Sequence, residues 1–403
     1  MNPFAISDAL SCISVDVHTT ELFEGIWPTP EGVTLNTYLV KGKKNALIDL
    51  VQDRHKASDQ VQTALQTQGL DLKAVDYLIL NHLEPDHTGW LKQFREKNPQ
   101  AEIIATPKGI NLVKSFYNIN ENLRAVKDGE TLDLGNGTVL TFFETPNLHW
   151  PETMVTWEGA SGTLFSCDAF GSFGALGGRL FDDEFSPPEL QAFEKNTLRY
   201  YANIVASFSP FVEKAIQKLA GLNIACIAPS HGLVWRKNPS AVIQQYQRYA
   251  SYSKGPAEQE IAVIWGSMYG NTKQGLEAVL EGIESEGLPY SLHRVPDDNI
   301  SYILAAAFKS AGLVIAAPTY EYALFPPMAY VLDIFRRKHI HRKTALRIGS
   351  WGWSGGAQKE YDASIAGLSW TSIEPFEWVG VPSPQDLEIL KNRGRALAQS
   401  IKT

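Results

Sequence analysis

One stretch decides the fold of the first half of this chain: residues 77–87, which read Tyr-Leu-Ile-Leu-Asn-His-Leu-Glu-Pro-Asp-His. The apolar run at residues 77–80 predicts a short buried strand. Directly after it come four potential metal ligands within six residues, namely His82, Glu84, Asp86 and His87. Residues of these types are seldom buried without a partner. Because the exit of a strand lets a loop aim its side chains at one point, the stretch predicts a metal site.

Three further candidate ligands follow strand-like apolar runs later in the chain: His149, Asp168 and His231. Taken singly, each is typical of a solvated or capping residue. Their shared placement indicates instead that separate strands deliver them to one edge of a sheet. Together with the cluster at residues 82–87 they would complete the metal site.

The first part of the chain reads as short strands in pairs, interleaved with helices. The expected strands are residues 37–40, 46–50, 77–80, 103–106, 139–143, 154–157 and 163–166. The expected helices are residues 59–67, 211–219 and 241–253. Paired strands with intervening helices favour an α/β/α sandwich over a purely parallel sheet.

A domain boundary is expected near residue 255. Gly255 and Pro256 follow the last helix of the first part, and glycine readily ends a helix while proline cannot continue one. We therefore expect two domains, residues 1–254 and 255–403. Beyond the boundary, apolar strands alternate regularly with helices, which predicts a doubly wound parallel sheet covered on both faces. The expected strands are residues 261–265, 290–295, 313–317 and 345–350, and the expected helices are residues 272–286, 303–310, 328–336 and 357–368.

Three loops of the second part are candidates for a flavin site. Residues 266–272, Gly-Ser-Met-Tyr-Gly-Asn-Thr, lie between a strand and a helix, where backbone N–H groups and the helix dipole favour a phosphate. The loop is not G-x-G-x-x-G, which disfavours a dinucleotide. Residues 318–322 and 351–356 follow the third and fourth strands, so they would open at the same carboxyl edge of the sheet. The candidate flavin-binding residues are Ser267, Met268, Tyr269, Gly270, Asn271, Thr272, Pro318, Thr319, Tyr320, Ser350, Trp351, Gly352, Trp353, Ser354 and Gly355.

The composition narrows the class of protein. The formal net charge is -8 over 403 residues, which argues against a nucleic-acid-binding footprint. No apolar run approaches the roughly 20 residues of a membrane-spanning helix, and residues 1–11 lack the pattern of a signal peptide. The three cysteines, Cys12, Cys167 and Cys226, are isolated and form no disulfide framework or metal knuckle. These features favour a protein of the reducing cytoplasm.

A basic run follows one of the helices of the second part, at residues 336–343. It contains Arg336, Arg337, Lys338, Arg342 and Lys343 together with two histidines. Such a run is typical of a solvated face. The alternative is a docking patch for an acidic electron donor.

The ligand pattern carries a family resemblance. H-x-E-x-D-H, followed by a distant histidine, an aspartate and a histidine, resembles the metallo-β-lactamase superfamily, whose hydrolases usually carry H-x-H-x-D-H. Glu84 stands here in place of the second histidine, and a carboxylate moves the preference of a site from zinc towards iron or manganese. With the flavodoxin-like half that follows, the pattern is similar to that of the flavodiiron proteins over essentially the whole chain. The resemblance implies an N-terminal metallo-β-lactamase-like αββα sandwich and a C-terminal flavodoxin-like domain.

The resemblance also implies the cofactors, which are a non-haem diiron centre and FMN. One iron would be held by His82, Glu84 and His149. The other would be held by Asp86, His87 and His231, with Asp168 bridging the two. In some members the histidine that matches His87 does not bind iron directly, so the role of His87 stays open.

The function implied is reduction of dioxygen to water, of nitric oxide to nitrous oxide, or of both. Electrons would pass through FMN from an external donor such as rubredoxin, because no rubredoxin-like CxxC module follows residue 403. A head-to-tail homodimer, or a dimer of such dimers, is implied as well. Two alternatives remain: a zinc-dependent hydrolase with an appended flavodoxin-like domain, and a flavodoxin-type electron carrier whose first half is only a scaffold. The preferred gas, the donor and the choice between dimer and tetramer stay open.

Overall fold

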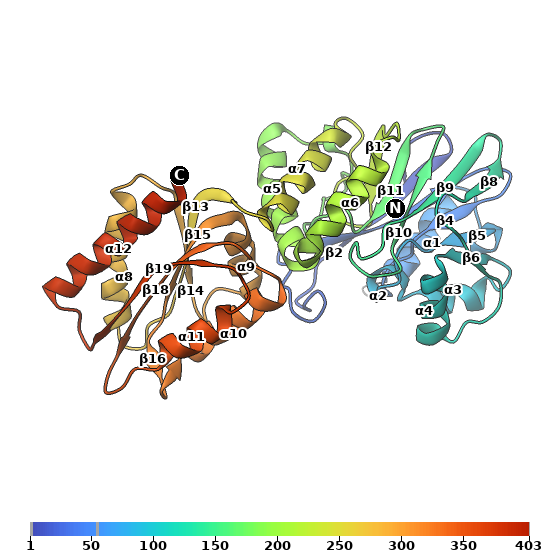
Figure 1. Ribbon diagram of the computed structural model, residues 1–403. Coiled ribbons are helices and arrows are strands. Elements are labelled where there is room, and N and C mark those ends of the chain that lie inside the picture. Colours follow the sequence, from blue (N-terminus) through green and yellow to red (C-terminus); the bar gives the residue numbers. More distant parts are fainter. Residues whose placement is uncertain (1–2, 54–55, 403) are drawn as a thin grey trace. The chain divides into compact units, whose positions relative to one another are not determined.

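The computed structural model describes residues 3–53 and 56–402 (Figure 1). The described chain divides into two compact units. The first contains residues 3–25, Thr29–Tyr201 and Pro210–Gln247, and the second contains Ile26–Pro28, Ala202–Ser209 and residues 248–402. Two short segments of the expected first domain, residues 1–254, therefore belong to the second unit, which the sequence analysis did not anticipate.

Two sheets form the centre of the first unit. The first has the strand order β1-β2-β3-β4-β5-β6-β7, and the second has the order β12-β11-β10-β9-β8. The strands of the first sheet are β1 (Phe4–Ala5), β2 (Leu10–Val17), β3 (Val33–Val40), β4 (Ala46–Ile48), β5 (Tyr77–Ile79), β6 (Glu102–Ala105) and β7 (Leu123–Ala125). Those of the second are β8 (Thr131–Gly135), β9 (Thr138–Glu144), β10 (Met154–Glu158), β11 (Thr163–Cys167) and β12 (Cys226–Pro229).

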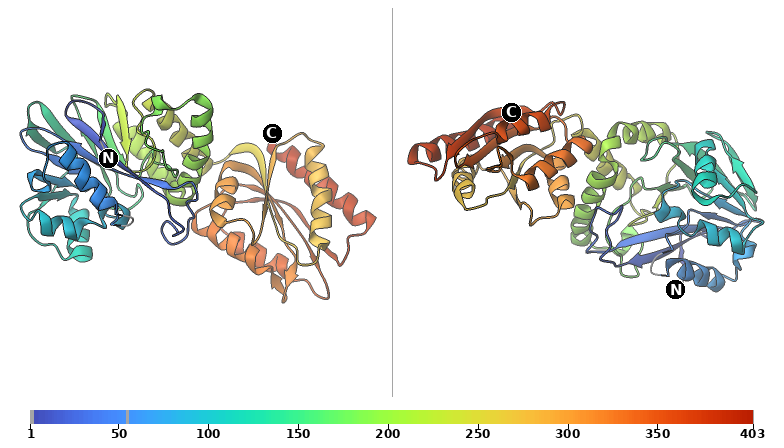
Figure 2. Two further views of the ribbon diagram at one scale, coloured as in Figure 1. Left: turned by 180° about the vertical axis from the view of Figure 1, so that it is seen from behind. Right: turned by 90° about the horizontal axis from the view of Figure 1, so that it is seen from below.

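The two sheets pack face to face through one apolar core. Ile48 and Ile79 of the first sheet share this core with Phe142 and Phe165 of the second, and all four side chains are buried. Helices lie outside the sheets (Figure 2). They are α1 (Ala57–Thr67), α2 (Pro85–Thr88), α3 (Leu91–Lys97), α4 (Pro107–Tyr117), α5 (Pro187–Tyr200), α6 (Ser209–Leu219) and α7 (Pro239–Tyr252). The arrangement confirms the predicted αββα sandwich.

Four helices of this unit, α2 to α5, were missing from the sequence analysis. Two of them, α4 and α5, carry recognisable start signals. Thr106 caps α4 by accepting a hydrogen bond from the Gly109 N–H at 3.1 Å, with Pro107 as the first helical residue. At the start of α5, Ser186 and Glu189 form a capping box. A capping threonine or serine followed by proline is a helix start signal that is present in the sequence itself.

The second unit contains a parallel sheet with the strand order β14-β13-β15-β18-β19. Its strands are β13 (Glu258–Trp265), β14 (Tyr290–Arg294), β15 (Ser310–Ala316), β18 (Thr344–Trp351) and β19 (Thr371–Val379), and a small hairpin is formed by β16 (Thr319–Tyr320) and β17 (Ala323–Leu324). Its helices are α8 (Asn271–Glu284), α9 (Ile300–Lys309), α10 (Pro326–Arg337), α11 (Ala357–Ile365) and α12 (Pro384–Lys402). Helices lie on both faces of the sheet (Figure 2), which confirms the doubly wound flavodoxin-like fold.

The last strand and the last helix of this sheet were also missing from the sequence analysis. Within β19 only Trp378 is buried, because β19 forms the edge of the sheet. An edge strand has no continuous apolar run, so the apolar pattern that identified the central strands does not extend to it.

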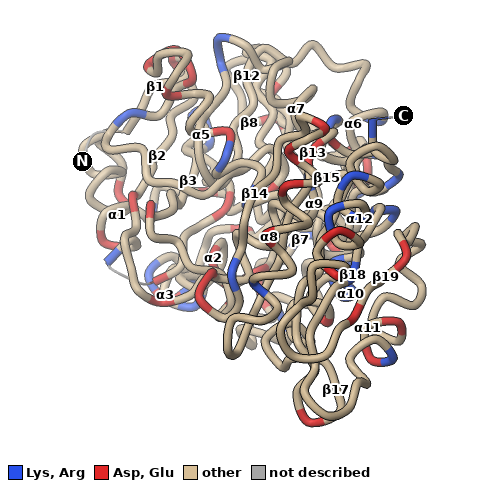
Figure 3. Tube along the Cα trace, turned by 90° about the vertical axis from the view of Figure 1, so that its left-hand side faces the viewer, with Lys and Arg blue, Asp and Glu red and all other residues tan. Residues whose placement is uncertain are grey.

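None of the helices in the described part of the chain is long and apolar enough to cross a membrane. Acidic and basic residues are interspersed along the trace (Figure 3).

The basic run at residues 336–343 is not a uniform solvated face, which corrects the expectation from the sequence. Arg336 and Arg337 are exposed and pair with Asp333 on the same helix. Lys343 is buried, and its Nζ donates to the Phe308 carbonyl at 2.7 Å. The run also lies where α10 ends and β18 begins, whereas the candidate flavin loops follow the opposite ends of the strands. A donor docked on it would be far from those loops.

The buried Lys343 makes the stability of the second unit depend on pH. Burial lowers its pKa from the usual 10.5 to about 7. Between these two values the unfolded chain binds a proton that the folded chain does not, so the free energy of unfolding rises with pH across this window. Below about pH 7 both states are protonated, and the contribution no longer changes.

We expect Lys343→Met to raise the free energy of unfolding at pH 7 by about 2 to 4 kcal/mol, since it removes the cost of burying a charge but also loses one hydrogen bond. Urea unfolding at pH 7 and pH 9 measures this. The variant should also show a smaller rise between the two pH values than the parent. Lys273→Met, at an exposed lysine, is the control. An unchanged pH slope in Lys343→Met would contradict the account.

Candidate metal centre and flavin pocket

All seven candidate metal ligands lie just after strands of the first unit. His82 and Glu84 follow β5, and Asp86 and His87 lie in the short helix α2. His149 belongs to the loop between β9 and β10. Asp168 directly follows β11, and His231 lies two residues after β12. The fold therefore brings side chains from four separate loops to one place.

The ligand atoms form two groups, within each of which all atoms lie within 4.8 Å of one another. The first group is His82, Glu84, His149 and Asp168, and the second is Asp86, His87, Asp168 and His231. Asp168 belongs to both.

The two oxygens of Asp168 face different groups. Its Oδ2 lies 3.5 Å from His82 Nε2 and 3.4 Å from His149 Nε2. Its Oδ1 lies 3.1 Å from His87 Nε2 and 3.5 Å from His231 Nε2. One carboxylate thus presents an oxygen to each of two adjacent ligand sets, which is the arrangement of a bridge between two metal ions.

The electrostatics of the cluster fit a site for cations. Burial by itself would raise the pKa of Asp168, but the neighbouring His87 and His149 hold that pKa well below its usual range. Burial likewise opposes protonation of His149, yet its hydrogen bonds with Asp168 and Glu84 raise its pKa to about 10. Without metal, the neighbouring carboxylates therefore hold protons on His82, His87 and His149, whose pKa values they raise. A metal ion takes the place of those protons, because it binds neutral imidazole and ionised carboxylate.

The donor atoms also fit a metal centre. Asp86 Oδ1 and Asp168 Oδ2 are buried, and the imidazole nitrogens that face them lie at 3.4 to 3.5 Å, which is long for a hydrogen bond to a carboxylate. Buried carboxylate oxygens ordinarily have partners, so these two have coordination capacity to spare. Four imidazoles and three carboxylates are harder Lewis bases than the thiolates and imidazoles typical of structural zinc sites. Such a ligand set suits iron.

Further buried groups hold the ligands in place. His82 Nδ1 lies 2.8 Å from Glu152 Oε1, and His231 Nδ1 lies 2.7 Å from the Thr34 carbonyl oxygen. Each contact leaves Nε2 facing the centre. Asp49 connects two ligand loops, since it accepts from the Asn81 N–H at 2.8 Å and from Ser230 Oγ at 3.4 Å. Burial raises the pKa of Asp49 to about 6.

These supporting residues were missed by the sequence analysis, because nothing in their local sequence distinguishes them. Tyr200 is the most informative example. Its hydroxyl donates to Asp168 Oδ1 at 2.8 Å, although the two residues are 32 positions apart. Only the folded chain shows that Tyr200 touches the bridging carboxylate.

We expect Tyr200→Phe to lower the affinity for iron about 10- to 100-fold, the usual cost of removing a hydrogen bond from a metal ligand. The ring packing against Phe173 is kept, so the fold should survive. Competition with a chelator measures the affinity, and circular dichroism checks the fold. Iron affinity equal to that of the parent would show that the hydroxyl has no part in holding Asp168.

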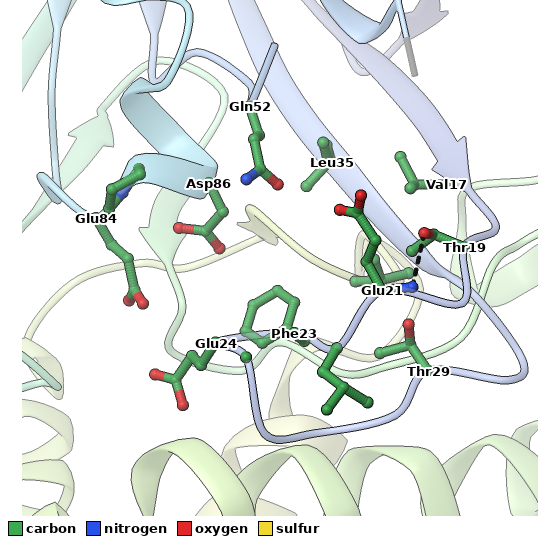
Figure 4. Close-up of a pocket in the computed structure, with 14 residues that line it drawn as sticks. Val17, Thr19, Glu21, Phe23, Glu24, Thr29, Leu35, Gln52, Glu84 and Asp86 are labelled. Atoms are coloured by element: carbon green, nitrogen blue, oxygen red, sulfur yellow. Dashed lines mark hydrogen bonds between the residues drawn. The ribbon is translucent and has the colours of Figure 1, made fainter. Parts of the chain in front are cut away.

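A cavity of about 280 Å³ adjoins this cluster (Figure 4). Glu84 and Asp86 line one side of the cavity, and the segment that follows β2 lines the other side. In this segment the Phe23 ring packs edge-on against His231, with centroids 5.7 Å apart. The cavity is large enough for a small molecule to reach the two carboxylates. Trp150, on the other side of the cluster, packs edge-on against His82 at 5.0 Å.

The candidate flavin residues gather around a second cavity, which lies within the second unit. It has a volume of about 300 Å³ and opens where β13, β15 and β18 end. Of the expected residues, twelve line it: Ser267, Met268, Tyr269, Asn271, Pro318, Thr319, Tyr320, Ser350, Trp351, Gly352, Trp353 and Ser354. The expected residues that do not line it are Gly270, Thr272 and Gly355, and the lining residues that the sequence analysis missed are Glu321, Tyr322 and Gly380.

Two features of this cavity fit a flavin phosphate and ring. Gly270 has φ 96°, a conformation that favours glycine, and it precedes the first turn of α8, where N–H groups are available to an anion. Thr272 Oγ1 lies 2.8 Å from Ser350 Oγ, which joins two of the loops. Thr319 Oγ1 is buried and has no hydrogen-bond partner in the described part of the chain. The lining thus offers a buried hydroxyl without a hydrogen-bond partner beside aromatic rings, which suits the polar edge and the flat ring of FMN.

The fold and the two sites define a class of protein. An αββα sandwich with a paired imidazole–carboxylate cluster, joined in one chain to a flavodoxin-like sheet with a flavin-sized pocket, is a two-centre redox protein. Comparison with known proteins identifies the family. A family model described as "ODP family beta lactamase" matches residues 33–232.

Curated relatives align over nearly the whole chain. The anaerobic nitric oxide reductase flavorubredoxin of Vibrio vulnificus (strain YJ016) is 32% identical over 389 residues, which is 95% of this chain and 76% of the relative. The protein of the same description from Salmonella arizonae is 34% identical over 391 residues, covering 95% and 78%.

Solved structures agree. Rubredoxin oxygen:oxidoreductase from Desulfovibrio gigas superposes with a TM-score of 0.93 at 28% identity, covering 100% of this chain and 99% of that one. A variant of the flavo di-iron protein of Thermotoga maritima gives a TM-score of 0.89 at 27% identity and covers 100% of both. This chain belongs to the flavodiiron proteins, a family of oxidoreductases that carry FMN and a non-haem diiron centre.

Proposed function

We propose that this protein reduces dioxygen to water, nitric oxide to nitrous oxide, or both, at a diiron centre that receives electrons through FMN. The balanced reactions are O2 + 4 H+ + 4 e− → 2 H2O and 2 NO + 2 H+ + 2 e− → N2O + H2O. When bound, two ferrous ions and reduced FMN supply up to four electrons. The observation that carries the proposal is the position of Asp168 between two adjacent ligand groups.

We assign the ligands by these two groups. His82, Glu84 and His149 would hold one iron, while Asp86, His87 and His231 would hold the other. Asp168 would serve both. His87 Nε2 lies 3.1 Å from Asp168 Oδ1 and 3.4 Å from Asp86 Oδ1, which supports His87 as a direct ligand.

The chain's own groups organise the remaining chemistry. Glu152 and Thr34 fix two imidazoles, and Tyr200 fixes the bridging carboxylate. The cavity beside Glu84 and Asp86 admits the gas, and Phe23 on its wall limits water near His231. These roles are consistent with a small, uncharged substrate.

We place the functional division at residues 254 and 255, with the diiron domain before it and the FMN domain after it. The FMN site consists of the three loops predicted from the sequence, including Glu321 and Tyr322 of loop 318–322, with Gly380 added. An external donor such as rubredoxin is proposed because relatives are described as rubredoxin oxygen:oxidoreductase and flavorubredoxin. The buried, unpaired thiols of all three cysteines favour the cytoplasm.

We further propose a head-to-tail homodimer, or a dimer of such dimers, in which a partner chain covers the flavin pocket. The support is an exposed aromatic rim on that pocket. Tyr269 is 91% exposed, Trp353 77% and Tyr322 63%. Aromatic groups that gather around one cavity at such exposure mark an interaction surface.

Anaerobic stopped-flow spectroscopy of the reduced protein against each gas tests the proposal. We expect rapid oxidation of the flavin and the metal centre by at least one of the two gases, with nitrous oxide or water as the product. Retention of the electrons in the presence of both gases would refute the assignment, as would oxidation by dioxygen alone that yields only superoxide or hydrogen peroxide. The zinc-hydrolase alternative predicts only such autoxidation of the flavin, and it is not favoured by the carboxylate at position 84 or by the oxidoreductase relatives.

A further inference from the structure

A buried ion pair lies beneath one of the flavin loops of the second unit. Arg347, on β18, is 1% exposed, and its Nη2 donates to Glu377 Oε1 of β19 at 2.9 Å. None of the flavin-site assignments above includes either residue. Burying a guanidinium costs free energy of folding unless its N–H donors have hydrogen-bond partners, so its presence here requires an explanation.

The guanidinium points along β18 towards the flavin pocket. A Cβ atom placed on Gly349 would lie 2.5 Å from Arg347 Nη1, so the guanidinium covers Gly349, two residues further along the strand. The next residues, Ser350 to Ser354, line the pocket. Glu377 pairs with Gly349 across the sheet, and its Oε2 lies 3.8 Å from where a Cβ on Gly355 would be. The ion pair therefore borders loop 350–355, with Arg347 against Gly349 just before the loop and Glu377 near Gly355 at its end.

The positive charge of the Arg347 guanidinium is incompletely neutralised by Glu377. Arg347 Nε and Nη1 are buried and have no hydrogen-bond partner among the described residues, and the same is true of the nearby Tyr361 hydroxyl. The Glu377 side chain is 22% exposed, whereas that of Arg347 is 1% exposed. Asp362, the other anion that acts on Arg347, is exposed. Water therefore screens both carboxylates more than the guanidinium, so a positive potential remains in the low-dielectric region under the loop.

From this geometry we propose that Arg347 is an electrostatic positioning residue, which stabilises the reduced form of FMN and so raises the reduction potential of the bound flavin. The inference rests on the assignment of the pocket to FMN. Reduction by two electrons with uptake of one proton leaves a negative charge on the flavin ring. A buried cation beneath the ring loop favours that charged form over the neutral oxidised one.

Removing Arg347 and removing Glu377 should shift the reduction potential of the bound FMN in opposite directions. Arg347→Met removes the cation, and we expect it to reduce the preference for reduced over oxidised FMN about tenfold, or about 30 mV for a two-electron couple. Glu377→Gln removes the anion and should shift the potential upwards. Arg347→Lys keeps the charge and should retain most of the parent's potential.

The test is spectroelectrochemical titration of the full chain loaded with FMN, with FMN affinity and circular dichroism measured alongside. Lys343→Met is the matched control, because Lys343 is a second buried basic residue that lies just before β18, at the end of the strand away from the flavin loops. Its removal should leave the potential unchanged. If Arg347→Met does not fold, the upward shift in Glu377→Gln still tests the proposal.

Equal potentials in the parent, Arg347→Met and Glu377→Gln would overturn the inference, as would shifts of both variants in the same direction, which a purely structural role would produce. Failure of the proposed function is distinguishable from these results. In that case the parent chain itself would not bind FMN, or variants of loop 266–272 would bind FMN as tightly as the parent.

Discussion

Replacing Asp168 by asparagine is expected to remove the diiron centre and to lower the rate of gas reduction at least about a thousandfold, or roughly 4 kcal/mol of barrier. The carboxylate serves both ligand groups, and an amide offers one neutral oxygen in place of two charged ones. Loss of the bridge therefore weakens both iron positions at once, whereas loss of any other ligand weakens one. Metal analysis and gas consumption measure the result.

Asp133→Asn is a suitable control for this change, because Asp133 is an exposed carboxylate on β8 that belongs to neither ligand group. It should retain the parent's iron and activity. FMN content should stay at the parent's level in both variants, since the flavin loops belong to the other unit. An Asp168→Asn protein with two irons and full activity would show that Asp168 is not the bridge.

Replacing Ser267 by aspartate is expected to weaken FMN binding at least about 100-fold, because it places a negative charge at the proposed phosphate site, where fixed like charges repel strongly. Ser267 Oγ accepts from the Gly270 N–H at 3.0 Å just before α8. A carboxylate there can accept from the same N–H and complement the dipole of the helix. The variant should therefore fold at least as stably as the parent while losing the cofactor.

The variant is expected to bind FMN less tightly while its fold is at least as stable as the parent's. This combination distinguishes a local effect on the phosphate site from general destabilisation of the fold. Ser285→Asp introduces the same charge at the other end of α8 and should leave FMN affinity unchanged. Fluorescence of released FMN gives the affinity, and thermal unfolding without FMN gives the stability. FMN affinity in Ser267→Asp equal to that of the parent would place the phosphate elsewhere.

Much of the fold followed from the sequence, for identifiable reasons. Strands that are buried on both faces, such as β15, are almost wholly apolar and were predicted directly. The edge strand β19 is largely exposed and gave no such pattern. The grouping of Ile26–Pro28 and Ala202–Ser209 with the second unit depends on tertiary packing, which local periodicity does not contain.

The candidate site divides in the same way. Ligands such as His82 and His231 were visible in the sequence because their residue types are conspicuous directly after apolar strands. Glu152, Asp49 and Tyr200 were not, since their roles depend on contacts between segments far apart in the chain. Arg347 was likewise invisible. An arginine inside a strand pattern predicts a solvated position, and only the structure shows it buried beneath loop 350–355.

The convergence of seven side chains on a bridged pair of iron ions is tested most directly by Mössbauer spectroscopy of the full chain loaded with iron-57, together with its metal content. We predict two irons per chain in two distinct sites that are magnetically coupled through the shared carboxylate. A single iron per chain, two uncoupled irons, or zinc in place of iron would contradict that prediction.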